Sequence, residues 1–189
     1  RSRAPGAIEP KAQEAMSAFF GALEAETDRP LLCKNNALNA SAHLVAPPLP
    51  TARFICIERP REALALSLLM ARLDIHGDAR VPYGLRGDDQ QPGDHPIEDV
   101  CRQVLYHEAL GRLQAERLGP ERFIRVRFEE ICRDPRGFVT LVGQRVLGES
   151  PDFASTDPVL APFATTPRPD TAELRQRIED TFTRMAGSG

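Results

Sequence analysis

The chain has 189 residues, 41% of them apolar and 27% charged, which is typical of one globular domain. Its 24 basic and 27 acidic residues give a formal charge of -3, so no overall basic field favours nucleic acid as a partner. No apolar run approaches the roughly 18 residues of a membrane span, and residues 1–10 lack the apolar core of a signal peptide. We therefore predict a single soluble domain over residues 1–189, with neither nucleic acid nor a membrane as partner.

The first residue and the cysteines suggest the setting of the protein. The chain begins with Arg1 rather than Met, which predicts a natural chain that starts further upstream. The four cysteines form no C-x-x-C pair, so no metal site is predicted. Cys33, Cys56 and Cys132 lie in short apolar runs, which favours buried free thiols over disulfides. Unpaired thiols predict a reducing compartment, the cytoplasm; a targeting signal upstream would lie outside this sequence.

The first half of the chain predicts helices around two strands. Apolar residues recur every three or four positions over residues 10–26, which predicts a helix that packs on another element. Residues 31–33 are predicted as a short strand, and residues 35–44 as a turn and a short helix. The apolar run of residues 53–58 predicts a buried parallel strand. A proline then starts a helix over residues 60–73.

The second half continues this alternation after a long connection. Residues 74–95 are rich in Gly, Asp, Gln and Pro and are predicted as a flexible loop, either an acceptor-side lid or a solvated insertion. A helix over residues 96–119 and a strand over residues 123–128 follow. Further helices are predicted over residues 134–148 and from Asp170 onwards. Strands separated by helices predict a three-layer α/β domain with a mainly parallel sheet.

Arg59 and Ser67 are the most informative polar residues. Arg59 lies where a predicted strand ends and a helix begins, the place at which open α/β sheets bind ligands. Its guanidinium can bind a phosphate through two hydrogen bonds, and the first N–H groups of the helix add positive potential. Ser67 follows about two helical turns later and can present its hydroxyl to the same anion. In the structural alternative, Arg59 pairs with Glu58 or Glu62, and Ser67 is only a small helix residue.

These residues resemble a motif of the sulfotransferases that use 3′-phosphoadenosine 5′-phosphosulfate (PAPS). In that family a strand ends in Arg-x-Pro or a close variant, and a Ser eight positions after the Arg helps to hold the 3′-phosphate of PAPS. Arg59 and Ser67 have this spacing. The family also has a Lys at the end of the preceding strand, and Lys34 is similar to it. Residues 123–148 resemble the family's later strand, acidic turn and Asp-Pro-started helix, so the resemblance covers residues 30–148.

The resemblance implies a fold, a reaction and three site residues. It implies a three-layer P-loop-NTPase-like fold, PAPS as cofactor and adenosine 3′,5′-bisphosphate as product. The sulfuryl group would pass to a hydroxyl or amine of a small molecule, a carbohydrate or a peptide. Lys34 would be the catalytic residue that stabilises negative charge on the leaving phosphate oxygen. Arg59 and Ser67 would be the cofactor-binding residues, and no metal is implied.

The sequence departs from the family pattern at the position of the catalytic base, the residue that would remove the proton of the acceptor. Cytosolic members have a His two residues after the Lys, where this chain has Asn36. Glu14 and Glu24 are only guesses for a base, and His43 and His107 lie in predicted helices. No catalytic base is therefore predicted.

A second departure concerns the strand and phosphate-binding loop with which the family fold begins, since neither is seen in this sequence. Two explanations stay open: a chain that lacks its N-terminal part, or a non-catalytic relative that binds a nucleotide or a protein partner. A nucleotide kinase or another P-loop NTPase is a further alternative, but it needs the missing phosphate loop and magnesium ligands.

Overall fold

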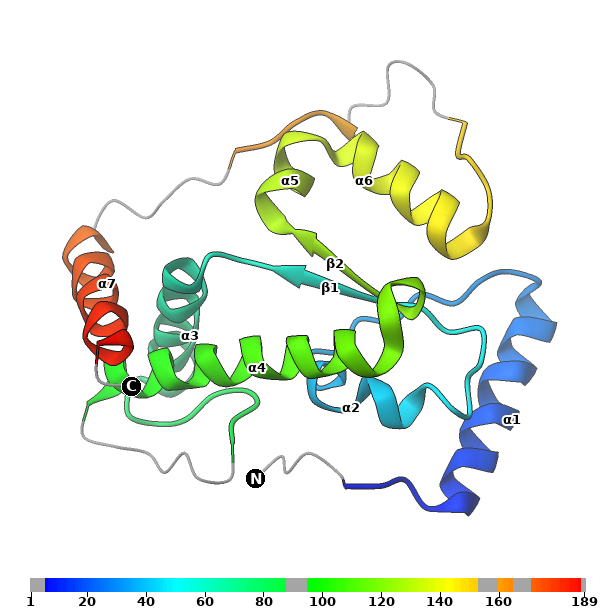
Figure 1. Ribbon diagram of the computed structural model, residues 1–189, viewed down its shortest axis with the longest axis horizontal. Helices are drawn as coiled ribbons and strands as arrows, with labels where there is room; N and C mark the ends of the chain where they lie inside the picture. Colours follow the sequence, from blue (N-terminus) through cyan, green and yellow to red (C-terminus); the bar gives the residue numbers. More distant parts are fainter. Residues whose placement is uncertain (1–5, 88–94, 153–159, 165–170, 188–189) are drawn as a thin grey trace. The chain divides into compact units, whose positions relative to one another are not determined.

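The computed structural model describes residues 6–87, 95–152, 160–164 and 171–187 (Figure 1). Helices form most of the regular structure, and both strands are short. In chain order the elements are α1 (Pro10–Thr27), α2 (Leu38–Val45), β1 (Phe54–Glu58), α3 (Arg61–His76), α4 (Pro96–Arg122), β2 (Phe123–Arg127), α5 (Phe128–Arg133), α6 (Pro135–Val142), the π-helical turn η1 (Gly143–Leu147) and α7 (Ala172–Ala186).

The chain divides into two compact units. The first contains residues 59–112 and 166–189, and so α3, most of α4 and α7. The second contains residues 4–58 and 113–165, and so α1, α2, both strands, α5, α6 and the end of α4. The boundary after β1 falls between two adjacent residues, Glu58 and Arg59.

The second unit holds a parallel sheet of β1 and β2 (Figure 1). The register runs from Phe54 opposite Phe123 to Glu58 opposite Arg127. The strands predicted over residues 53–58 and 123–128 are confirmed, and the described residues form an α/β protein with a two-stranded parallel sheet and flanking helices. The finer prediction, a three-layer P-loop-like arrangement, stays a prediction. Ile57 of β1 is 51% exposed, so this strand is less buried than predicted.

The predicted strand over residues 31–33 is wrong, because the chain has no regular secondary structure there. Leu32 is 93% exposed, and Cys33 is exposed too, so the predicted burial of this thiol is also wrong. A short apolar run forms a strand only where a neighbouring strand takes up its hydrogen bonds, and among the described residues no strand pairs with this segment. Cys132 is buried as predicted, whereas Cys56 is half-buried.

Helix α1 forms at the predicted place, but its predicted packing is only partial. None of its residues is buried, and Phe19 on its apolar face is 60% exposed. Its hydrogen bond to a distant part of the chain is donated by the Ser17 hydroxyl to the Pro48 carbonyl at 2.6 Å. Amphipathic spacing thus predicted the helix correctly, but it did not determine how much of the apolar face is covered.

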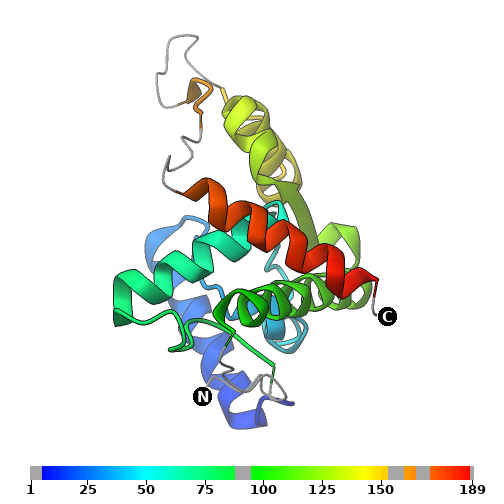
Figure 2. The ribbon, with the colours of Figure 1, turned by 90° about the vertical axis from the view of Figure 1, so that its left-hand side faces the viewer.

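The first unit is a helical packing of α3, the first part of α4, and α7 (Figure 2). Thr171 precedes α7 as its N-cap, while the predicted cap residue Asp170 lies outside the described residues. Apolar side chains from all three helices form one core. These residues are Ala65, Leu66, Leu68, Leu69, Val100, Cys101, Val104, Ile178 and Phe182.

Several predicted helix ends are confirmed by their local geometry. Gly119 has φ 69° and ψ 168°, so the regular part of α4 ends there, as predicted. Asp134 caps α6, because its Oδ1 accepts a hydrogen bond from the Gly137 N–H at 2.8 Å. Gly148 ends η1 in the left-handed conformation. Within the described ranges, no helix combines the length and the apolar character that crossing a membrane requires.

Candidate functional site

The junction between β1 and α3 places Arg59 as predicted. The strand ends at Glu58 and the helix begins at Arg61, with Pro60 between them in an extended conformation (φ -51°, ψ 138°). Proline lacks an N–H group and has a fixed φ, so it ends the strand and suits the entry to a helix. Arg59 therefore follows the carboxyl end of a parallel strand directly, and it is exposed.

Ser67 lies on the exposed side of α3. Its neighbours Leu66 and Leu68 are both buried in the core, whereas Ser67 itself is exposed. It lies six positions after Arg61, and so roughly 9 Å along the helix axis from the first residue of α3. Among the described residues, none forms a hydrogen bond with its hydroxyl. This hydroxyl is therefore available to a ligand near the first two turns of α3.

Lys34 lies in a different unit from the other two predicted site residues. It is an exposed residue in the irregular segment before α2, and Asn35 caps the following turn by accepting a hydrogen bond from the Ala37 N–H at 2.9 Å. Arg59 and Ser67 belong to the first unit, whereas Lys34 belongs to the second. The assignment of all three residues to one site stays a prediction.

Glu58, the last residue of β1, is bound by a cation from β2. The Arg125 Nε donates to the Glu58 Oε1 at 2.6 Å, and this hydrogen bond raises the pKa of the Arg125 guanidinium. Cys56 lies directly opposite Arg125 in the register. Burial raises the pKa of the Cys56 thiol, and the negative charge of Glu58 raises it further. Cys56 is therefore a protonated thiol and a poor nucleophile at neutral pH.

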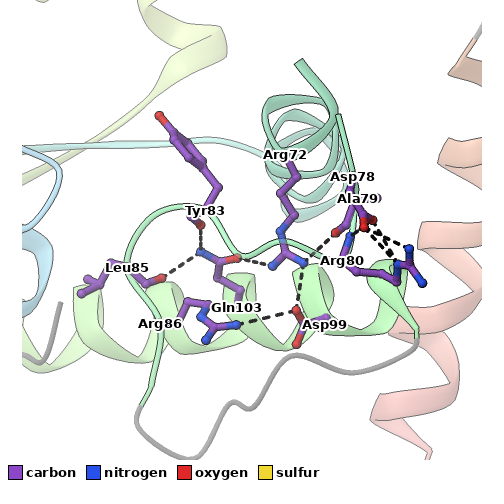
Figure 3. Close-up of polar contacts among 9 residues, drawn as sticks. All are labelled: Arg72, Asp78, Ala79, Arg80, Tyr83, Leu85, Arg86, Asp99 and Gln103. Carbon is purple, nitrogen blue, oxygen red and sulfur yellow. Dashed lines mark hydrogen bonds and ion pairs between the residues drawn. The ribbon is translucent and has the colours of Figure 1, made fainter. Parts of the chain in front are cut away.

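A buried guanidinium anchors α3, the helix that carries Ser67 (Figure 3). The Arg72 side chain is 0% exposed, and its Nη1 donates to Asp99 Oδ2 at 2.8 Å and to the Ala79 carbonyl at 3.2 Å. Its Nη2 donates to Gln103 Oε1 at 2.9 Å. Because a buried charge is tolerated only with such partners, these bonds fix α3 against α4 and the chain that follows α3.

The described part of the predicted loop over residues 74–95 is held by hydrogen bonds (Figure 3). The first three residues of the predicted loop belong to helix α3, so the loop begins later than predicted. The Gln103 Nε2 donates to the carbonyls of Tyr83 and Leu85, at 2.8 and 2.9 Å. These bonds hold the loop backbone against α4; residues 88–94 lie outside the described residues.

Two histidines in helices make structural hydrogen bonds. The backbone N–H and the Nδ1 of His43 both face Gln114 Oε1, at 2.9 and 3.0 Å. The carboxamide oxygen only accepts, so Nδ1 carries the hydrogen. The His107 Nε2 lies 2.8 Å from the Leu85 carbonyl, and burial lowers the pKa of His107. Both side chains serve to join elements, and neither is identified as a base.

Sequence reasoning missed Arg72 and its partners. A signal was present, because Arg72 follows Leu68 and Leu69 by four and three residues and therefore falls on the buried face of α3. The partners gave no local signal, because Asp99 and Gln103 lie 27 and 31 residues further along the chain.

Comparison with known proteins identifies a family whose sequence pattern this chain matches. A family model described as "Sulfotransferase family" matches residues 6–148. The match includes Lys34, Arg59 and Ser67, and it extends the similarity from residue 30 back to residue 6, so that α1 is also covered. No curated protein and no solved structure matches the chain significantly.

Proposed function

The chain belongs to the sulfotransferase family, and on that premise we propose that it transfers a sulfuryl group from PAPS to a hydroxyl or amine. The junction between β1 and α3 carries the proposal: an exposed guanidinium follows a parallel strand, and an exposed hydroxyl lies eight residues later on the helix. The proposed acceptor is a small molecule, a carbohydrate or a peptide. The proposed compartment is the cytoplasm, because all four cysteines are unpaired thiols.

The chemistry of the junction fits an anionic nucleotide. A guanidinium binds phosphate oxygens through charge-assisted hydrogen bonds, so we assign the 3′-phosphate to Arg59. The Ser67 hydroxyl would donate to the same group. The first N–H groups of α3, a helix of 16 residues, add positive potential near its start. These interactions would bind and orient the donor, so that acceptor and sulfur meet in line.

The reaction needs a cation near the leaving group. PAPS supplies an activated sulfuryl group: the acceptor atom bonds to sulfur, the bond from sulfur to the 5′-phosphate oxygen breaks, and the acceptor proton is released. We assign stabilisation of the negative charge on the leaving oxygen to the Lys34 ammonium. The leaving product is adenosine 3′,5′-bisphosphate.

A non-catalytic nucleotide-binding role is the second candidate. The segment that carries Lys34 is not a strand, so no sheet hydrogen bonds hold this residue. Catalysis needs groups held within fractions of an ångström, and an exposed residue outside a helix or strand is held less firmly than one in a sheet. Nucleotide binding without sulfuryl transfer would select this candidate.

A transfer assay tests the proposal directly. The wild-type chain is incubated with PAPS that carries labelled sulfur, and with phenol, amine, carbohydrate and peptide acceptors. We expect label transfer that falls by about 100-fold or more in Lys34→Ala, because an electrostatic stabiliser of the transition state is lost. Lys11→Ala is the matched control, since Lys11 is an exposed lysine on α1. Equal transfer by wild type and Lys34→Ala would remove Lys34 from catalysis.

A further inference from the structure

The last residue of β2 is an exposed arginine at the carboxyl edge of the sheet. Arg127 lies opposite Glu58 in the register. The Glu58 carboxylate, however, is bound by Arg125 at 2.6 Å. Among the described residues, none forms a hydrogen bond or an ion pair with the Arg127 side chain. The Glu58 carboxylate opposite Arg127 is therefore already bound by Arg125, and the Arg127 guanidinium is exposed at the carboxyl edge of the sheet.

The packing of β2 fixes the side to which this arginine points. Side chains alternate along a strand, so Arg125 and Arg127 share one face, and Ile124 and Val126 share the other. The two apolar residues are 3% and 8% exposed. A shift by one residue would bury two guanidinium groups and expose the apolar pair, so the orientation of Arg127 is strongly determined.

We propose that Arg127 is a further donor-binding residue that contacts a phosphate group of PAPS. The inference rests on the proposed function, because it takes PAPS as the ligand. Open α/β sheets bind ligands beyond the carboxyl ends of their strands, and Arg127 occupies that position on β2. Its planar fork of N–H donors suits two oxygens of one tetrahedral anion.

Binding of adenosine 3′,5′-bisphosphate to wild type and Arg127→Gln, by isothermal titration calorimetry, tests the inference. We expect Arg127→Gln to weaken binding by about 10-fold or more, the loss of a charge-assisted contact. Arg127→Lys keeps the charge and is expected to lose less. Arg117→Gln is the matched control, because Arg117 is an exposed arginine of the same unit that lies on α4 and not at the carboxyl end of a strand. Its affinity should equal that of the wild type.

Adenosine 3′-phosphate and adenosine 5′-phosphate distinguish the group contacted. If Arg127→Gln loses affinity only for ligands with a 3′-phosphate, Arg127 contacts that group. If it loses affinity only for ligands with a 5′-phosphate, Arg127 contacts the 5′ end. Either result supports the inference. If wild type binds the bisphosphate and Arg127→Gln binds it equally well, the inference fails while the proposed function stands. If wild type binds neither the bisphosphate nor PAPS, the proposed function fails and the inference with it. Urea denaturation of each variant shows that it is folded.

Discussion

At the scale of single residues, the proposed recognition of the nucleotide depends on Arg59. Its substitution by Ala should weaken the binding of adenosine 3′,5′-bisphosphate by about 1–3 kcal/mol, the range for a hydrogen bond to a charged group. Titration calorimetry measures this difference. Arg112→Ala is the control, because the Arg112 side chain is 59% exposed on α4 and its ion pair with Glu108, at 4.0 Å, is long. Unchanged affinity in a folded Arg59→Ala variant would remove Arg59 from the site.

His107 gives the stability a predictable dependence on pH. Burial lowers its pKa below the ordinary 6.5, so the folded state favours the neutral imidazole. Below about pH 6.5 the unfolded state takes up a proton that the folded state does not, and the free energy of unfolding falls as the pH falls. Above that range both states are neutral and the contribution of His107 no longer changes with pH.

Urea denaturation between about pH 5 and pH 8 measures this effect. His107→Gln should show a smaller loss of stability on acidification than the wild type. Parallel pH curves for the two proteins would mean that His107 titrates equally in the folded and unfolded states.

At the scale of elements, the buried pair of Arg72 and Asp99 joins α3 to α4. Arg72→Met should lower the free energy of unfolding by about 3–5 kcal/mol, because it leaves the Asp99 carboxylate, 3% exposed, without its main partner. Adding Asp99→Asn should recover part of the loss, since the uncompensated charge is then gone. Urea denaturation measures both effects.

The matched control for this prediction is a surface pair in the same unit. Arg80 and Asp78 lie at a similar distance, 3.0 Å, but their side chains are 66% and 39% exposed. Arg80→Ala should therefore change stability by only about 1 kcal/mol or less. Similar losses for Arg72→Met and Arg80→Ala would contradict the structural role of the buried pair.

The elements also show which features a sequence can predict. Local signals were sufficient for both ends of α4 and for the start of α6, because Pro96, Gly119 and Asp134 act on their own backbone. The prediction of a strand over residues 31–33 was wrong, because a strand depends on a partner strand elsewhere in the chain. The position of Arg59 at a strand end could be predicted from the residues beside it. The partner of Arg72 is distant in sequence, so this contact could be identified only from the structure.

At the scale of the whole molecule, the formal charge of -3 opposes an anionic donor. The proposed recognition of PAPS therefore relies on local cations, and the ones we propose are Lys34, Arg59 and Arg127. All three lie within residues 6–148, the part of the chain that the family model matches.

Thermal unfolding of the wild-type chain with added nucleotides tests the central claim, PAPS-type recognition, most directly. Adenosine 3′,5′-bisphosphate is titrated against ADP, which carries a similar charge without a 3′-phosphate, and against AMP. A ligand that binds only the folded state adds about 2.7 kcal/mol of stability at a concentration of 100 times its Kd. We predict a rise in Tm with the 3′-phosphorylated nucleotide that ADP and AMP do not match and that Arg59→Ala loses. No shift, or an equal shift with ADP, would contradict it.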